Sequence, residues 1–314
     1  FLTGTPHLPL FEDDPALAEV IPFPAGDRTG IDALAKDLTS RRFDALVALY
    51  VDGDVARLVR RTGAPLKIGP LSKPRTWFLF NRPFRQKRSQ VQMHEADYNG
   101  RLLEGLGVTY RPRPPRIRLS AEKLSREGPL LSKILGKRAA DTFVVLHPGM
   151  GGSALNWPPG RYAELAGHIL RERQEAIVVT GMPADAPFFA EVLKKAHPRL
   201  VDGTGKLDLT GLALLLRRAS AFIGPSTGPM HLATAVDTPV IAIFSPLGVQ
   251  QPRRWGPYNS RGTVVTPDLG CGEKHRCSAG RCPDYDCMER ITVDEVFTAL
   301  AGWLEREGGI PGKE

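Results

Sequence analysis

The chain has 314 residues, of which 42% are apolar and 24% charged, and it carries a formal net charge of +8. This length can bury the cores of two domains, and the composition excludes a disordered or fibrous protein. No apolar run reaches the roughly 18 residues that a membrane-spanning helix needs. The sequence opens at Phe1 without a Met or a secretory signal, so we expect it to start inside a longer cytoplasmic protein.

The first half alternates short apolar runs with helical patterns. Strands are expected over 19–23, 43–51 and 65–69, and helices over 31–42, 54–63 and 94–107. The segment TYRPRPPRIRL comes next, and its three prolines predict a stiff extended linker.

The second half shows the same alternation more clearly. Continuous Val, Ile and Leu runs predict buried parallel strands, and the segments between them have helical patterns of ten or more residues. Strands are expected over 142–147, 176–181, 199–205, 221–225 and 239–246, and helices over 161–173, 183–196, 208–219 and from Pro229. The fold class is therefore α/β, with two Rossmann-like doubly wound domains facing a central cleft.

A glycine-rich loop follows the strand that ends at His147, at the edge where open parallel sheets bind ligands. Gly149, Gly151 and Gly152 free backbone amides to turn toward an anion, and Ser153 adds a hydroxyl donor. A loop of this kind is also a common plain turn between a strand and a helix. By itself it leaves both interpretations open.

The second loop of interest is GPSTGPMHLATA. Pro229 is typical of the first helical position, which puts Gly228 or Thr227 at the N-cap. The amides of Met230 and His231 would then point out of the helix start, where the helix dipole favours an anion. The Thr227 hydroxyl and the His231 ring could reach the same anion, although a lone His is more often a packed or capping residue. Two such helix starts in one half-sheet predict a diphosphate held in the cleft.

These residues also carry a resemblance. FIGPSTGPMHLATAVDTPVIAIFSP, LHPGMGGSALNWPPGRYAELA and CMERITVDEVFTAL resemble glycosyltransferase family 9, the ADP-heptose lipopolysaccharide heptosyltransferases. FDALVALYVDGDVARLVRRTGAPLKIG in the first half resembles the same family. The resemblance implies a GT-B fold and transfer of heptose from ADP-heptose to the lipopolysaccharide core, with inversion and without a metal or another cofactor.

The resemblance also implies a domain plan and a donor site. It predicts an acceptor domain over 1–118, a linker over 119–140, a nucleotide-sugar donor domain over 141–290 and a helix over 291–314 that crosses back to the first domain. It assigns the donor's diphosphate and sugar to loop 149–153 and to Ser226, Thr227 and Gly228, with His231 lining the same pocket.

Three departures from the family limit what the resemblance implies. The family's catalytic base is an Asp in a Gly-Asp loop, and that element is expected before Phe1. Leu155 stands where the family often has Lys or Arg facing the phosphates, and Ser226 where it often has Asp. Losing a cation beside a diphosphate weakens binding by about 1 kcal/mol or more. A family member with another sugar donor and a catalytically impaired nucleotide-sugar-binding protein are therefore the alternatives.

A basic and aromatic segment, KPRTWFLFNRPFRQKR, lies in the first half. It suits an anionic membrane interface or a phosphorylated lipid core, which predicts a lipid-linked acceptor and a peripheral position on the inner face of the inner membrane. A half-buried strand with a charged loop would have the same composition, and so would a nucleic-acid site, which is the least favoured interpretation. The predicted surface cations are Lys73, Arg75, Arg82, Arg85, Lys87 and Arg88, interleaved with Trp77, Phe78, Phe80 and Phe84.

All four cysteines, Cys271, Cys277, Cys282 and Cys287, lie in one short segment. Their spacings of five, four and four intervening residues do not match the CxxC pairs of common zinc sites. We expect reduced thiols there, while a structural metal site or two short disulfides stay open.

Overall fold

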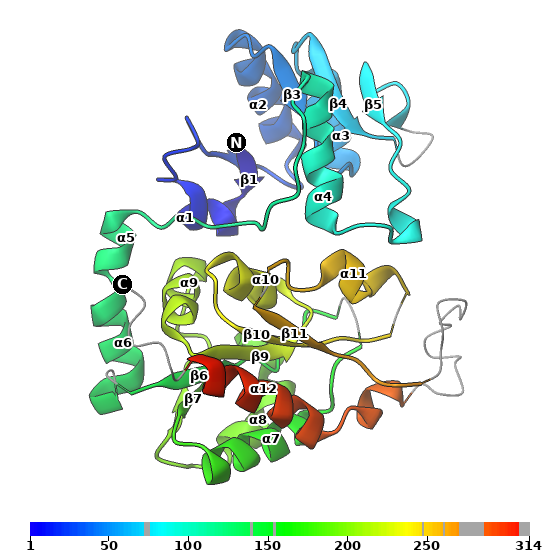
Figure 1. Cartoon of the computed structure of the whole chain (residues 1–314). Helices are drawn as coiled ribbons and strands as arrows, with labels where there is room; N and C mark the ends of the chain where they lie inside the picture. The colour runs from blue at the N-terminus through cyan, green and yellow to red at the C-terminus, as the bar shows by residue number, and fades with distance from the viewer. Residues whose placement is uncertain are drawn as a thin grey trace. The chain divides into compact units, whose positions relative to one another are not determined.

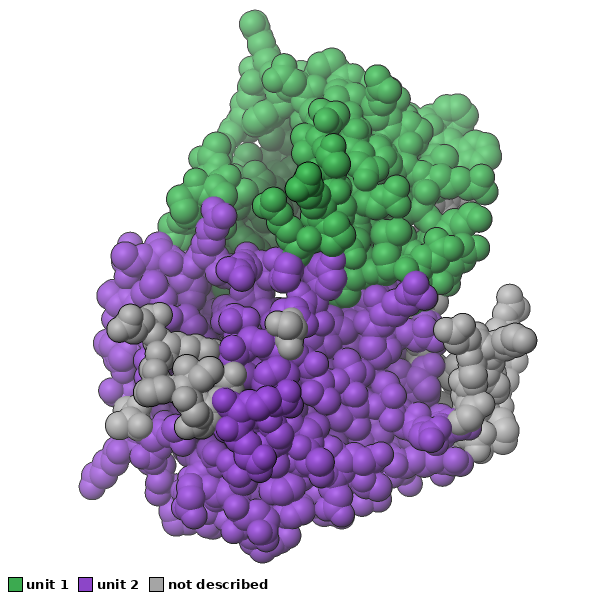
Figure 2. Space-filling model, viewed as in Figure 1, with its two compact units in different colours: residues 1–113 green, residues 114–314 purple. Residues whose placement is uncertain are grey.

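The computed structural model describes residues 1–71, 76–138, 141–152, 155–246, 248–259, 261–269 and 286–307. The chain divides into two compact units, residues 1–113 and 114–314 (Figure 2). Among the described residues, no helix has the length and apolar character that crossing a bilayer requires.

The strands of unit 1 form two parallel sheets. β1 (Leu2–Gly4) pairs with β2 (Ile21–Phe23), while β3 (Ala45–Val47), β4 (Leu66–Pro70) and β5 (Arg82–Phe84) form the other sheet. The helices of this unit are α1 (Leu8–Phe11), α2 (Arg28–Ser40), α3 (Gly53–Arg61) and α4 (Glu95–Gly100).

Local side-chain chemistry fixes two of these helices. Asp27 caps α2 by accepting from the Gly30 amide, and Asp52 caps α3 by accepting from the Val55 amide. An apolar cluster that includes Ile31 of α2 and Leu58 of α3 lies against β1 and β2.

One expected helix of unit 1 is split. The predicted helix over 94–107 is present as α4 followed by a 3-10 helix, Arg101–Leu106. Gly100 leaves room for the Tyr110 ring, because a Cβ there would lie 2.0 Å from it. The Tyr110 hydroxyl donates to an Asp97 carboxylate oxygen at 2.7 Å, which holds the ring in this place. The predicted helix is therefore present, with its second half wound as a 3-10 helix.

Unit 2 contains a six-stranded parallel sheet with the order β11-β10-β9-β6-β7-β8. This is the strand order of the dinucleotide-binding α/β folds, and it confirms the predicted fold class. The strands are β6 (Phe143–Leu146), β7 (Ala176–Val179), β8 (Leu200–Asp202), β9 (Ala221–Pro225), β10 (Val240–Ile243) and β11 (Gly262–Val265).

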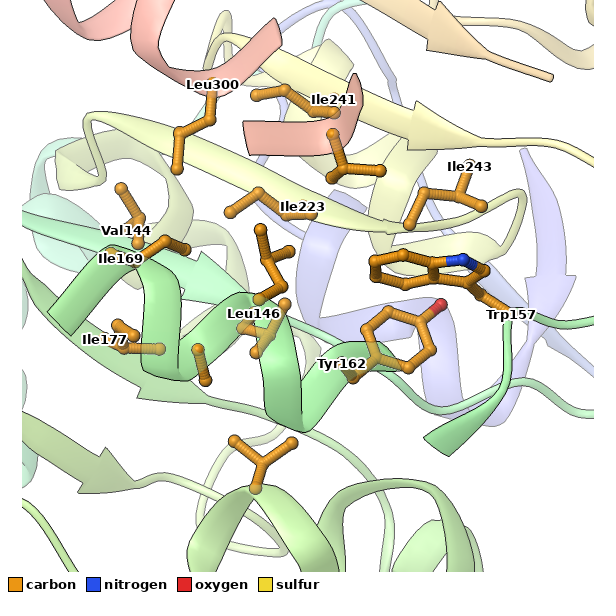
Figure 3. Packing of buried hydrophobic residues seen from close by; sticks show 14 of the residues in the cluster. Val144, Leu146, Trp157, Tyr162, Ile169, Ile177, Ile223, Ile241, Ile243 and Leu300 are labelled. Atoms are coloured by element: carbon orange, nitrogen blue, oxygen red, sulfur yellow. The ribbon is translucent and has the colours of Figure 1, made fainter. Parts of the chain in front are cut away.

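Helices cover both faces of this sheet (Figure 1). α7 (Pro159–Glu172), α8 (Ala186–Leu193) and α12 (Val293–Glu307) lie on one face, and α9 (Leu209–Arg218) and α10 (Gly228–Ala235) on the other. Figure 3 shows part of the core between the sheet and the first group, where Trp157 and Tyr162 pack edge to face with ring centroids 5.0 Å apart. This rigid sheet positions the loops described next.

Two segments of the predicted domain plan are helical in the structure. The linker predicted over 119–140 contains α5 (Ala121–Ser125) and α6 (Glu127–Leu135), and α6 packs on α9. The helix predicted to cross back to the first domain is α12, which packs on α7, β9, β10 and β11 of unit 2. The physical reason is its apolar face, since Val296, Leu300 and Leu304 are buried in the core of unit 2.

Candidate functional site

The strand order of unit 2 reverses between β6 and β9. These strands are neighbours, but the chain continues from β6 to β7 on one side and from β9 to β10 on the other. In doubly wound sheets, ligands bind beyond the carboxyl ends of the strands at such a reversal. Gly224 at the end of β9 allows a close approach here, because a Cβ there would lie 2.7 Å from the His147 carbonyl oxygen. The two loops singled out by the sequence therefore begin side by side.

The glycine-rich loop after β6 has two kinds of glycine. Gly151 and Gly152 are exposed, and Gly152 has a φ of +75°, a conformation that glycine adopts readily. Gly149 has a packing role, since a Cβ there would lie 2.6 Å from the carboxyl carbon of Asp185. An acidic side chain at this distance does not suit an anion contact at Gly149. Ser153, the predicted hydroxyl donor, lies outside the described residues.

The start of α10 corrects one detail of the sequence prediction. The amides of Met230 and His231 both donate to the Thr227 carbonyl oxygen, at 3.1 and 3.3 Å, so neither points freely out of the helix. The Met230 side chain is fully buried, so it packs in the core. Among the described residues, no side chain caps this helix and no acceptor is found for the exposed Gly228 amide. The open donor is therefore two residues before Met230, because Pro229 between them has no N–H.

The other predicted groups at the start of α10 differ in the contacts that they make. Thr227 is half-buried, and its hydroxyl donates weakly to the Pro225 carbonyl oxygen at 3.4 Å. Ser226 is also half-buried. The His231 ring lies edge-on to Trp255, with centroids 6.1 Å apart, and the Arg254 guanidinium carbon lies 5.0 Å from the centroid of that indole. The Arg254 guanidinium therefore lies against the indole that packs beside His231. The sequence analysis did not assign Arg254 to the site.

His147 is a second residue, besides Arg254, that the sequence analysis did not assign to the site. Its Nδ1 lies 2.9 Å from the Thr180 hydroxyl at the end of β7. Burial lowers the pKa of His147 from 6.5 to about 4, and the nearby Asp185 carboxylate raises it by a smaller amount. The imidazole is therefore neutral at physiological pH and links the ends of β6 and β7. The position of His147 at the end of an apolar strand is the sequence feature that could have pointed to it.

In unit 1, the basic segment lines a small pocket of about 280 Å³ beyond the carboxyl end of β5. Its cations are Arg85 and Lys87 of the predicted surface, together with Arg101, which the sequence analysis did not assign. Gln86, Gln92 and Tyr98 add polar groups, and Phe84 and Met93 complete the lining. Arg82 is exposed but does not line the pocket. Lys73 and Arg75 lie outside the described residues.

Arg88 differs from the other predicted surface cations. Its guanidinium forms an ion pair with Glu95, donates to Asn99 at 2.9 Å and donates to the Leu49 carbonyl oxygen at 3.1 Å. Only 15% of its side chain is exposed. The structure therefore assigns Arg88 to the framework of unit 1, because a buried guanidinium needs this set of acceptors.

The sequence matches the family described as Glycosyltransferase family 9 (heptosyltransferase) over residues 31–281. This match covers most of the chain. The chain belongs to glycosyltransferase family 9.

Relatives and solved structures agree with this family 9 assignment. A Haemophilus influenzae protein with no name more specific than glycosyltransferase is 27% identical over 260 residues, which are 78% of this chain and 74% of that protein. The family 9 glycosyl transferase structure from Veillonella parvula has a TM-score of 0.81 at 22% identity, over 97% of this chain and 87% of that one. The E. coli ADP-heptose lipopolysaccharide heptosyltransferase II has a TM-score of 0.77 at 21% identity, over 98% and 89% of the two chains. These likenesses establish the predicted GT-B-type fold.

The residues that follow the glycine-rich loop hold its end in place. Leu155 is partly buried and packs against the core of unit 2, so this position provides no charge to the loop. The next residues fix the loop end, since Asn156 donates to the Pro148 carbonyl oxygen at 2.8 Å and the Trp157 indole donates to the Ile291 carbonyl oxygen at 2.9 Å. These two hydrogen bonds hold the C-terminal end of the loop.

The cysteine segment is described only at its end. Cys287 is buried, whereas Cys271, Cys277 and Cys282 lie outside the described residues. Within the described ranges, no cluster of three or more His, Cys, Asp or Glu side chains has the arrangement of a metal site.

Proposed function

We propose that this family 9 chain transfers heptose from ADP-heptose to the lipopolysaccharide core or a related lipid-linked acceptor. One observation carries the proposal: the reversal point between β6 and β9 brings together the glycine-rich loop and the uncapped start of α10. The family description names heptosyltransferases, and the name of the similar E. coli structure includes ADP-heptose.

We assign the donor's diphosphate to backbone and side-chain donors at this point. The Gly228 amide and the positive end of α10 attract the phosphates, and Thr227 and His231 adjoin them. Gly151, Gly152 and Ser153 approach from the other loop. Because Leu155 packs in the core, the missing cation is replaced by Arg254, which lies over the indole that contacts His231.

The proposed reaction needs charge stabilisation on the leaving group. An acceptor hydroxyl oxygen forms a bond to the anomeric carbon of the sugar, and the bond from that carbon to the diphosphate oxygen breaks with inversion. The negative charge that develops on the diphosphate is stabilised by the fixed dipoles at the start of α10 and by Arg254, without a metal ion. The proton of the acceptor hydroxyl passes to a general base, for which no residue is assigned in the described chain.

We assign an anionic part of the acceptor to the pocket in unit 1. Arg85, Lys87 and Arg101 present three cations around about 280 Å³, enough for a carboxylate or phosphate group with part of its sugar. A lipid-linked acceptor of this kind would place the enzyme at the inner face of the inner membrane.

Donor binding is tested by calorimetry with ADP on the full-length protein. Thr227→Val, His231→Ala and Arg254→Gln should each weaken binding about tenfold, the effect of one hydrogen bond to a charged group. Thr298→Val and Arg253→Gln, exposed positions that we assign no role, should leave the affinity unchanged. Unchanged affinity in all three site variants would remove the start of α10 from the donor site.

Transfer is tested by mass spectrometry of a lipopolysaccharide core acceptor after incubation with ADP-heptose and other nucleotide sugars. A heptosyl adduct that forms in the presence of a chelator supports metal-independent transfer, and its anomeric configuration by NMR reports inversion. Leu155 and Ser226 motivate the second candidate, a nucleotide-sugar-binding protein without turnover. Tight ADP binding with no adduct from any sugar donor would favour that candidate.

A further inference from the structure

The connection from β4 to β5 exposes two adjacent aromatic side chains. Phe78 is 95% exposed and Trp77 is 59% exposed. Single exposed apolar residues are common on protein surfaces, but two neighbouring large aromatics at these exposures form an apolar projection.

The same turn is firmly anchored on both sides of this pair. Thr76, Leu79 and Phe80 are each 5% exposed or less. Leu79 and Phe80 belong to an apolar cluster of unit 1, and the Phe80 ring lies against Gly69 so closely that a Cβ there would lie 2.2 Å from it. Trp77 and Phe78 therefore project from a turn whose neighbouring residues Thr76, Leu79 and Phe80 are buried.

The sequence around the turn carries positive charge only. From residue 55 to residue 94 it contains ten Lys or Arg residues and no Asp or Glu, although Arg57 and Arg61 pair with Asp32, and Arg88 pairs with Glu95. Among these cations, Arg82, Arg85 and Lys87 follow the turn closely and are exposed. A Trp side chain suits the headgroup region of a bilayer because it combines a large apolar ring with a polar N–H, and cations beside it are attracted to anionic headgroups.

We propose that the turn Thr76–Leu79 is a membrane-docking element that inserts Trp77 and Phe78 into the headgroup region of an anionic bilayer. The proposal deepens the function proposed above and rests on it, because a lipid-linked acceptor lies at such a surface. Phe80 and Phe84 of the same sequence segment are not part of the element, since Phe80 is buried and Phe84 is half-buried.

Vesicle binding by the full-length protein tests the proposal. The probe is co-sedimentation with vesicles of phosphatidylcholine alone or mixed with phosphatidylglycerol, without any lipopolysaccharide. The wild type should bind the mixed vesicles and bind the neutral ones more weakly. The double variant Trp77→Ser/Phe78→Ser should lose at least about tenfold in partitioning, since burying one aromatic side chain contributes at least that factor. Phe43→Ser, which removes another exposed aromatic of unit 1, is the matched control and should bind as the wild type.

Trp77 supplies a second readout that needs no new label. Its emission should shift to shorter wavelength with the mixed vesicles and be quenched by brominated lipids, because Trp77 is the most exposed of the four tryptophans: Trp157 and Trp303 are 0% and 8% exposed, and Trp255 is half-buried. The variant Trp77→Phe should abolish the shift while keeping most of the binding. Equal vesicle binding by wild type and double variant, or quenching that persists in Trp77→Phe, would overturn the proposal. Aromatic-dependent binding of a single-stranded oligonucleotide without vesicle binding would overturn it in favour of nucleic acid.

The outcome is separable from that of the proposed function. The double variant should bind ADP as the wild type does and should keep its transfer to a delipidated acceptor, while transfer to a vesicle-embedded acceptor falls. If the wild type does not bind ADP, the glycosyltransferase proposal is wrong, whereas the result of the vesicle experiment is unaffected. Normal transfer to the embedded acceptor by the double variant would defeat only the docking element.

Discussion

Acidification should destabilise unit 2 through His147. The folded protein keeps this imidazole neutral until about pH 4, whereas an unfolded chain protonates it near pH 6.5. Between these values the unfolded state binds more protons than the folded state, so the free energy of unfolding falls as the pH falls. The contribution is complete above pH 6.5. The difference between 6.5 and about 4 corresponds to about 3 kcal/mol in total, of which about 2 kcal/mol is lost by pH 5.

Urea unfolding at pH 7.5 and pH 5, followed by the emission of the buried Trp157 and Trp303, measures this loss. His147→Asn keeps a polar group near Thr180 but removes the titration, so its loss of stability between the two pH values should be smaller by about 2 kcal/mol. His7→Asn changes an exposed imidazole of unit 1 and should retain the wild-type pH dependence. The reasoning is refuted if His147→Asn and the wild type lose the same stability on acidification.

Three further predictions concern packing in unit 2. Gly224→Ala should lower the free energy of unfolding by about 1–3 kcal/mol in urea titrations, because its Cβ would overlap a backbone carbonyl oxygen, whereas Gly228→Ala has open space and should change it much less. Trp303→Phe should cost about 1 kcal/mol in the same assay, since the indole donates to a β11 threonine hydroxyl at 2.8 Å; an unchanged midpoint contradicts this. Glu127→Gln should lower the thermal midpoint by weakening the bidentate contact between α6 and α9, and an equal midpoint would show that this contact contributes nothing.

Much of the fold followed from the sequence. The apolar runs of unit 2 became buried strands because Val, Ile and Leu on both faces require cover from helices on both sides. The expected helix over 94–107 is present, but its second half is a 3-10 helix, which the sequence pattern did not distinguish from an α-helix. The sequence analysis missed α5 and α6 because the linker that it predicted after the proline-rich stretch was extended over their residues.

The candidate site shows where residue type is not enough. Sequence reasoning found the start of α10, but it chose the amides of Met230 and His231, which the Thr227 carbonyl oxygen occupies. It also treated Arg85 and Arg88 alike, whereas one lines a pocket and the other is bound by Glu95 and Asn99. Hydrogen-bond partners that come from distant parts of the chain make these differences.

The sequence by itself determined the class of fold and the chemistry of the loops, because apolar periodicity, prolines and glycines act over a few neighbouring residues. Only the tertiary structure decided that β6 and β9 are adjacent, which places both loops at one reversal point. It alone also turned Phe80 inward and Phe78 outward, although the two lie two residues apart. Strand order and side-chain burial depend on contacts between residues far apart in the chain, and such contacts leave no local pattern in a single sequence.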